Sequence, residues 1–360
     1  MKLCSNILIL IYNILEKKKL LTKIFIAFTV VVIIAGSYII NKAFTSNTKF
    51  EQDEVFVYVP TNSDYEAVKK ILAPYVDNQQ KIDWVAAKRG YNTNVKAGKF
   101  LLKKGMSSFS IVRALRLSVP VKLAFNNQER IDDLYKRIAS QVEPNEIQLK
   151  AVFENEKFLA DHGLTKETVL TFFIPNTYEF YWDVTAEELA EKFSKEFHRF
   201  WTESRLEKAK ALQLTPAQVY ILASIVHKET AKADERPRVA GVYLNRLKQS
   251  MPLQADPTVI YAQKLAQNNW NLVIKRVIND DTRISSPYNT YRVTGLPPGP
   301  IFMPDVSAID AVLNAEKHKY MYFCASVEKF GYHEFATSYE EHLVIAKKYG
   351  AWVAKQGYKR

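Results

Sequence analysis

The stretch Leu222-Ala-Ser-Ile-Val-His-Lys-Glu229 predicts an apolar helix that carries a single carboxylate. Thr215 is a typical N-cap residue and Pro216 a typical first-turn residue, so we expect this helix to begin there. The apolar spacing continues downstream, and we expect helical structure over residues 215–248 with an interruption near residues 231–237. A helical core with short flanking strands indicates a protein of the α+β class.

Glu229 lies on the apolar face of this predicted helix, together with residues three, four and seven positions earlier: Val226, Ile225 and Leu222. Burial disfavours the charged form of a carboxyl group and raises its pKa. Glu229 could therefore keep its proton near neutral pH and donate it to a leaving group. The alternative is a structural glutamate that pairs with an arginine such as Arg236 or Arg246.

Further motifs follow in a fixed order: Asp234-Glu-Arg236, Val242-Tyr-Leu-Asn-Arg-Leu247, Leu253-Gln-Ala-Asp-Pro-Thr-Val-Ile-Tyr261, Tyr288-Asn-Thr-Tyr291 and Gly295-Leu-Pro-Pro-Gly-Pro-Ile301. Together with residues 223–230 they resemble the motifs of the MltG/YceG-like family of endolytic murein transglycosylases. The resemblance extends from about Val55 to the C-terminus. The family's catalytic acid falls on Glu229, whereas the first Glu of its Glu-Lys-Glu run is His227 here.

The resemblance implies a small LysM-like α+β subdomain over residues 55–118 and a larger mixed α/β catalytic domain over residues 119–360. It also implies cleavage of MurNAc–GlcNAc bonds within nascent glycan strands, which leaves 1,6-anhydroMurNAc ends and terminates elongation. Glu229 alone would act as the acid and then as the base, with no cofactor. Two alternatives stay open: a peptidoglycan glycoside hydrolase that uses Glu235 or Asp256 as a second carboxylate, and a non-catalytic wall-binding scaffold.

Several polar and aromatic residues near these motifs are candidates for substrate binding: Gln254, Asp256, Thr258, Tyr178, Tyr288, Asn289 and Tyr291. Tyr178 belongs to an aromatic segment over residues 172–182, and aromatic rings stack on sugar faces but more often fill cores. Glu235 could instead cap a helix or pair with Arg236 or Arg238. The stiff loop over residues 295–301 could shape a cleft or simply connect two elements.

The N-terminal region predicts a membrane anchor. Residues 24–40 contain no charge, and we expect a transmembrane helix over residues 24–42. The leader, residues 1–23, carries five lysines and one glutamate, which places the N-terminus in the cytoplasm and the rest of the chain outside. Residues 7–15 suggest an interfacial helix, and residues 43–54 a polar tether. The alternative is a cleaved signal peptide.

Composition narrows the class of partner. The net charge is +12, yet no cluster of basic and aromatic residues outside the leader suggests nucleic-acid binding. The six histidines and two cysteines show no metal-ligand spacing, so we expect no metal. We expect the partners to be peptidoglycan strands, the cytoplasmic membrane and, through the resemblance, peptidoglycan synthases.

Local patterns also predict individual elements. We expect strands at residues 55–59, 99–102, 119–125 and 320–325, helices at residues 65–72, 110–117 and 339–356, and a turn at Asp256-Pro257. Ala97-Gly-Lys-Phe and the segment from Gly105 resemble the LysM-like part of the family, which would help to hold glycan. The alternative is a small packing module without a ligand.

Overall fold

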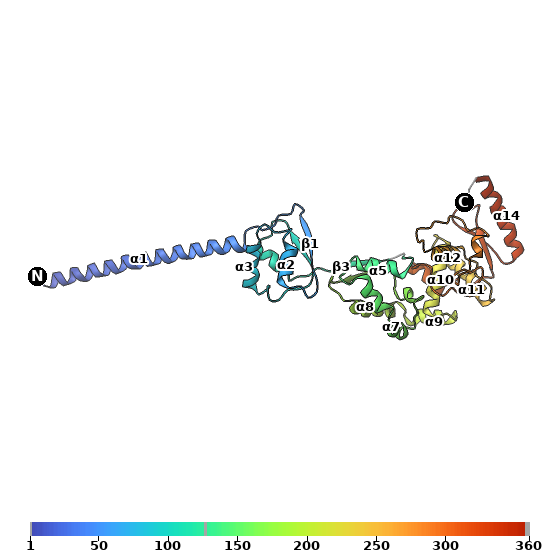
Figure 1. Cartoon of the computed structure of the whole chain (residues 1–360), viewed down its shortest axis with the longest axis horizontal. Coiled ribbons are helices and arrows are strands. Elements are labelled where there is room, and N and C mark those ends of the chain that lie inside the picture. The colour runs from blue at the N-terminus through green and yellow to red at the C-terminus, as the bar shows by residue number, and fades with distance from the viewer. Residues whose placement is uncertain (1, 126–127, 357–360) are drawn as a thin grey trace. The chain divides into compact units, whose positions relative to one another are not determined.

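The computed structural model describes residues 2–125 and 128–356 (Figure 1). The chain forms two compact units: Met1–Val121 with Tyr181–Asp183, and Lys122–Phe180 with Val184–Arg360. Each unit contains helices and short two-stranded sheets, in the order β1-β2, β3-β4 and β5-β6 along the chain. The expected mixture of helices and strands is confirmed.

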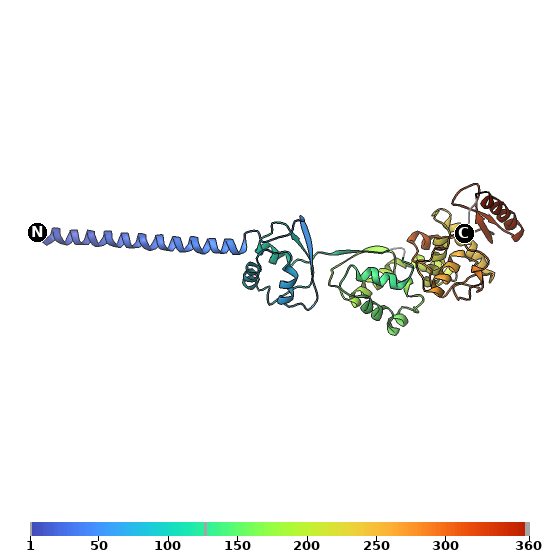
Figure 2. The same ribbon diagram turned by 45° about the horizontal axis from the view of Figure 1, so that its top comes forward.

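The first unit begins with one long helix, α1 (Lys2–Ala43), which is continuous in both ribbon views (Figures 1 and 2). Its segment Leu15–Ala43 has a mean hydropathy of 2.3 and is long and apolar enough to cross a membrane. Its apolar side chains are exposed, as Phe25 and Ile34 illustrate. Residues 7–15 continue the same helix rather than forming a separate one, and most of their side chains lie outside the described residues.

The rest of this unit is a two-stranded antiparallel sheet packed on three helices. Its elements are β1 (Glu54–Val59), α2 (Tyr65–Leu72), α3 (Gln79–Arg89), β2 (Gly98–Lys103) and α4 (Ser108–Ala114). Side chains alternate along β1, so Val57 and Val59 enter the core whereas Phe56 and Tyr58 are exposed. The strands predicted at residues 55–59 and 99–102 and the helix predicted at residues 65–72 are confirmed. The helix predicted at residues 110–117 is found two to three residues earlier, as α4, and α3 was not predicted.

The segment expected to be a polar tether, residues 43–54, is instead part of this unit. Asn47 is 1% exposed, and its Nδ2 atom donates to the Asn78 carbonyl oxygen at 2.9 Å and to Ser108 Oγ at 3.0 Å. Phe50 is also buried and packs edge-on against Tyr75. The tether prediction is wrong because these partners lie far along the chain, where local composition gives no sign of them.

The N-terminal half of the second unit surrounds an aromatic core. Its elements are β3 (Val121–Phe125), α5 (Ile131–Ala139), α6 (Glu146–Phe153), α7 (Glu156–Asp161), η1 (Val169–Phe172), β4 (Asn176–Phe180), α8 (Ala186–Phe200) and α9 (Glu203–Ala211). Strands β3 and β4 pair. Phe153, Phe173 and Phe193 pack against one another with ring centroids 4.9–6.1 Å apart. The aromatic segment thus interrupts the helices as expected.

The C-terminal half of this unit is built on the predicted helix pair. Its elements are α10 (Pro216–Glu229), α11 (Arg236–Lys248), α12 (Asp256–Gln267), η2 (Asp281–Arg283), α13 (Val306–Leu313), β5 (Tyr322–Ala325), β6 (His333–Ala336) and α14 (Tyr339–Gln356). The break between α10 and α11, strand β5 and helix α14 confirm the sequence predictions. The turn expected at Asp256-Pro257 is wrong, because both residues open α12, where a first-turn proline leaves no hydrogen bond unmade.

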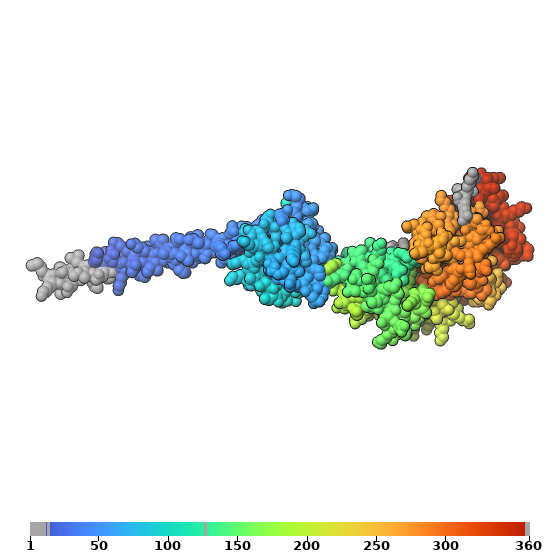
Figure 3. Space-filling model, in the orientation of Figure 1, coloured from blue at the N-terminus to red at the C-terminus, as the bar shows by residue number. Residues whose placement is uncertain are grey.

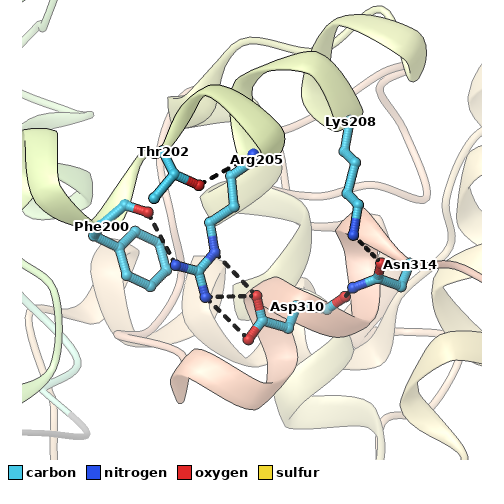
Figure 4. A network of polar contacts seen from close by, with 6 residues as sticks. All are labelled: Phe200, Thr202, Arg205, Lys208, Asp310 and Asn314. Atoms are coloured by element: carbon cyan, nitrogen blue, oxygen red, sulfur yellow. Dashed lines mark hydrogen bonds and ion pairs between the residues drawn. The ribbon is translucent and has the colours of Figure 1, made fainter.

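A network of polar contacts fixes α9 to α13, which in turn packs against α10 (Figure 4). The Arg205 guanidinium donates from Nε and Nη2 to the Asp310 carboxylate at 3.0–3.2 Å, and from Nη1 to the carbonyl oxygen of Phe200 at 2.9 Å. Lys208 donates to Asn314 Oδ1 at 2.6 Å. The bidentate ion pair between Arg205 and Asp310 therefore fixes α9 to α13, next to α10.

Strands β5 and β6 pair in antiparallel fashion and lie beside α14, which Figure 2 shows in red. Figure 3 shows the red surface of this C-terminal layer directly against the orange surface of the part of the chain that precedes it. Side chains of α11 hold the chain leading into β5: Asn245 Nδ2 donates to the Tyr320 carbonyl oxygen at 3.0 Å, and Arg246 Nε to that of Met321 at 2.7 Å. The chain entering β5 is therefore held against the C-terminal end of α11.

Candidate active site

Helix α10 carries Glu229 as its last residue. The helix begins as predicted: Thr215 accepts a hydrogen bond from the Gln218 backbone in a capping box, and Pro216 follows. Every residue from Val219 to Val226 is buried, so the helix is anchored along its length. Its C-terminal end disfavours negative charge, which adds to the effect of burial on a carboxyl group placed there.

Glu229 opens onto a pocket of about 430 Å³. The side chains around it come from α10, α11, α12, α14, both C-terminal strands, and the loops before α12, after α12 and after η2. Those with polar, ionisable or aromatic groups are Glu229, Tyr243, Arg246, Gln254, Asp256, Lys275, Arg276, Tyr291, Phe323, Cys324, His333 and Tyr349. The pocket thus combines two carboxyl groups with three basic side chains. Its lining is mostly polar, as suits a ligand rich in hydroxyl groups.

The surroundings of Glu229 shift its titration toward neutral pH. Burial raises the pKa of the Glu229 carboxyl from 4.5 to about 7. The hydroxyl of Tyr243 donates to Glu229 Oε1 at 2.6 Å and opposes this rise, as does the charge of Arg246, whereas Asp256 adds to it. Because Glu229 is only partly enclosed, its carboxyl is both desolvated and accessible from the pocket.

Asp256 is the second carboxylate of the pocket. It accepts a hydrogen bond from the Tyr291 hydroxyl at 2.6 Å. Desolvation raises the pKa of Asp256, while the bond from Tyr291 and the charge of Arg276 lower it. Its side chain remains exposed to solvent, which screens the shift, so we regard Asp256 as the more readily ionised of the two acids.

Other predicted residues of this region either line the pocket or support it. Gln254 lines it and has a backbone φ of +50°, held by a hydrogen bond from its N–H to the Thr290 carbonyl oxygen. Thr258 is buried and bonds to Ala255 and Thr290. Asn289 is also buried, and its amide donates to two backbone carbonyl oxygens of the loop before it. Thr258 and Asn289 therefore hold the loops that carry Gln254 and Tyr291.

Tyr178 and Tyr288 lie away from this pocket. The Tyr178 ring is buried, stacks on Phe125 at 5.3 Å, and its hydroxyl donates to the Ile174 carbonyl oxygen at 2.6 Å. Tyr288 packs against Tyr261 with ring centroids 4.7 Å apart, beside a separate hollow of about 290 Å³. The local sequence gives no sign of this separation, since Tyr288 and Tyr291 belong to one motif.

Glu235 neither caps its helix nor pairs with Arg236 or Arg238. It is 4% exposed and accepts two hydrogen bonds from His333, from the backbone N–H at 2.7 Å and from Nδ1 at 2.8 Å. His333 lines the pocket but was not predicted as a site residue. Tyr243, Lys275 and Arg276 were missed as well; only Tyr243 carried a signal, because it lies within one of the motifs.

His227 lies on another side of α10, as its helical position predicts. Its Nδ1 atom accepts a hydrogen bond from the Asp305 backbone at 3.3 Å and lies 3.5 Å from the Asp305 carboxylate. Burial lowers the pKa of this imidazole, against the opposing effect of Asp305. His227 therefore supports the start of α13 instead of entering the pocket.

A partly enclosed carboxyl group with a pKa near 7, in a polar pocket of an α+β protein, defines a general acid–base site. Within residues 2–125 and 128–356, no group of three His, Cys, Asp or Glu side chains is placed to hold a metal ion. The sequence model described as the YceG-like family matches residues 57–348, and the chain belongs to this family.

The chain is also similar to individual named proteins and to solved structures, of which the following are examples. It is 27% identical over 346 residues to the endolytic murein transglycosylase of Bacillus subtilis, which covers 88% of this chain and 91% of that protein. The protein of the same name from Streptococcus pneumoniae is 40% identical over 134 residues, 37% of this chain and 24% of that protein. A putative YceG-like protein from Listeria monocytogenes superimposes with a TM-score of 0.54 at 26% identity, covering 82% of this chain and 99% of that chain.

Proposed function

We propose that this chain is an endolytic murein transglycosylase in which Glu229 acts first as the acid and then as the base. One observation carries the proposal: the Glu229 carboxyl group has a pKa of about 7 and lines a pocket that is open to a ligand. The names of the B. subtilis and S. pneumoniae relatives support the reaction class. A group with this pKa populates both protonation states near neutral pH, as an acid that becomes a base requires.

In the proposed reaction, Glu229 donates its proton to the glycosidic oxygen between MurNAc and GlcNAc as the bond from MurNAc C1 to that oxygen breaks. The Glu229 carboxylate then accepts the proton of the C6 hydroxyl of the same MurNAc as O6 bonds to C1. The product ends in 1,6-anhydroMurNAc, Glu229 regains its proton, and no water is consumed. Tyr243, which donates to Oε1, orients the carboxyl group throughout.

The other residues of the pocket would bind the sugar rings next to the cleaved bond. Gln254, Asp256 and Tyr291 line the pocket and present amide, carboxylate and hydroxyl groups. Thr258 and Asn289 would act indirectly, by fixing the loops that carry these groups. We assign no contact at the cleaved bond to Tyr178 or Tyr288, because both lie outside the pocket.

A glycoside hydrolase is the second candidate, favoured by one observation. Asp256 lines the same pocket as Glu229, so a second carboxylate is available to activate a water molecule. The two candidates differ in their products, since hydrolysis leaves a reducing MurNAc end that is heavier by one water than the anhydro end.

Product analysis separates these candidates. Purified peptidoglycan is incubated with the full-length protein in detergent, and the released fragments are measured by mass spectrometry. We expect fragments of several disaccharides that end in 1,6-anhydroMurNAc, and none with Glu229→Gln. Reducing MurNAc ends would establish the hydrolase, and single disaccharides alone would contradict the endolytic cut.

We further propose that α1 anchors the enzyme in the cytoplasmic membrane, with the N-terminus inside and the catalytic unit outside, where murein and its synthases lie. The apolar segment Leu15–Ala43 and the lysines that precede and begin it support this topology. A reporter fused after Arg360 should be active outside the membrane, with the protein retained there after a high-salt wash. Release of a form lacking the first ~40 residues would identify a signal peptide instead.

The LysM-like role of residues 55–118 also belongs to this proposal. The exposed face of the β1–β2 sheet carries Phe56 and Tyr58, each 40% exposed, and Lys99 Nζ lies 3.9 Å from the Phe56 ring centroid. Aromatic faces of this kind suit stacking on sugar rings. We propose that this sheet face helps to hold the glycan strand.

A further inference from the structure

His333 and Glu235 form a pair that the reaction described above does not use. Glu235, which precedes α11, is buried, and both of its carboxylate oxygens face His333, the first residue of β6. One oxygen accepts from the His333 backbone N–H and the other lies 2.8 Å from Nδ1 of the ring. The pair therefore joins two elements that lie 98 residues apart in the chain.

This pairing sets which ring nitrogen carries the proton. A carboxylate offers only acceptors, so the Nδ1 atom facing it is the N–H donor. In the neutral imidazole, Nε2 then carries a lone pair and can accept a hydrogen bond. Over the described parts of the chain, residues 2–125 and 128–356, Nε2 has no hydrogen-bond partner of its own.

The imidazole is also held in place within the pocket of Glu229. His333 and Glu229 both line that pocket. The ring packs edge-on against Phe323, with centroids 5.0 Å apart, and Phe323 packs edge-on against Tyr243 at 5.8 Å. Tyr243 is the residue that donates to Glu229. The His333 ring is thus held by Glu235 through Nδ1 and by the ring of Phe323, which in turn packs on Tyr243.

We propose that His333 binds the substrate by accepting a hydrogen bond at Nε2 from a sugar hydroxyl, and that Glu235 is the positioning residue that fixes this tautomer. The inference rests on the proposed function for the identity of the ligand. Glycan strands carry many hydroxyl donors, so a fixed acceptor in the pocket selects the position of one sugar ring. A buried carboxylate behind a histidine is a common way to fix the orientation of the ring.

The first variant separates contact with the substrate from support of the fold. His333→Asn keeps a side-chain N–H near the position of Nδ1 for Glu235 but removes Nε2. His198→Gln, on the exposed surface of α8, is the matched control. Both should unfold at the temperature of the wild-type protein. We expect kcat/KM on murein glycan to fall about tenfold or more for His333→Asn and to stay unchanged for the control.

The second variant tests the positioning role. In Glu235→Gln the side-chain amide can donate to Nδ1, which favours the tautomer with the proton on Nε2 and removes the acceptor. We expect the ¹⁵N chemical shifts of the His333 ring to report this change of tautomer, with a loss of kcat/KM similar to that of His333→Asn. Loss of activity with an unchanged tautomer would show that Glu235 has a structural role only.

A binding measurement tests the contact between His333 and the glycan independently of the proposed reaction. In the Glu229→Gln background, which cannot turn over, the Kd for soluble murein glycan is measured with and without His333→Asn. We expect affinity to weaken about tenfold. An unchanged Kd and unchanged kcat/KM would overturn the contact. Absence of wild-type turnover with the expected change in Kd would overturn the proposed reaction and leave the contact standing.

Discussion

Glu229 and His227 lie two residues apart in the last turn of α10 but face different surroundings. Glu229 opens onto the pocket beside Tyr243, whereas His227 lies against Asp305 at the start of α13. Burial raises the pKa of Glu229 to about 7 and lowers the pKa of His227, so both residues are driven toward their neutral forms. Only the neutral glutamate has an acidic proton next to a ligand space, and this difference in access separates a catalytic group from a structural one.

The largest expected effect follows from removing the acid. Glu229→Gln keeps the shape and the hydrogen bond from Tyr243 but cannot donate a carboxylic proton. We expect turnover of murein glycan to fall at least ~10²-fold, the usual contribution of general acid–base catalysis. Circular dichroism should show an unchanged fold, and a folded variant with near-normal turnover would reject the assignment.

The same substitution should change stability with pH. Because the folded-state pKa of Glu229 lies above its unfolded value, its favourable contribution is complete at low pH and is lost as the pH rises through about 7. Gln does not titrate. We therefore expect the difference in the free energy of unfolding, Glu229→Gln minus wild type, to increase by up to ~3 kcal/mol from pH 4 to pH 9. Denaturant unfolding at both pH values measures it, and an equal difference at both would argue against the shifted pKa.

Removal of the Tyr243 hydroxyl tests whether its hydrogen bond sets the pKa of Glu229. The hydrogen bond from Tyr243 lowers the pKa of Glu229, so Tyr243→Phe should raise it further and loosen the carboxyl. We expect a turnover loss of about 3- to 10-fold, with the alkaline limb of the pH profile moved upward. A downward move of that limb would show that Tyr243 does not stabilise the carboxylate. Tyr320→Phe is a control, since Tyr320 lies outside the pocket.

The smallest effect on turnover is expected from substitution of His227, on the side of α10 that faces away from the pocket. His227→Gln retains an acceptor for the Asp305 backbone N–H and does not alter the pocket. We expect turnover to change by less than about threefold, which corresponds to well under 1 kcal/mol in the barrier. A loss of turnover as large as that of Glu229→Gln would show that His227 also takes part in the reaction.

Residues close together in the chain were the predictable part of this molecule. Thr215 and Pro216 located the start of α10, and the apolar spacing placed Glu229 on its buried face, because capping and helical periodicity are local properties. Helices α2 and α14 were located for the same reason. The order of motifs then indicated the family.

Contacts between distant segments could not be predicted in this way. The composition around Asn47 predicted a polar tether, yet the hydrogen-bond partners of Asn47 lie 31 and 61 residues away. Glu235 meets His333 rather than a neighbouring arginine. Tyr288 and Tyr291 face different hollows although they share a motif, because a backbone turn separates their side chains. Each case depends on tertiary packing that the local pattern does not encode.

The pH dependence of the wild-type reaction tests the role of Glu229 most directly. The kcat/KM for murein glycan, measured from pH 5 to pH 9 with the full-length protein, reports the ionisation of the acid in the free enzyme. We predict high activity below the pKa of about 7 and a steady fall above it, as Glu229 loses the proton that it must donate. A profile that stays flat across this range would contradict the assignment of a buried Glu229 as the acid.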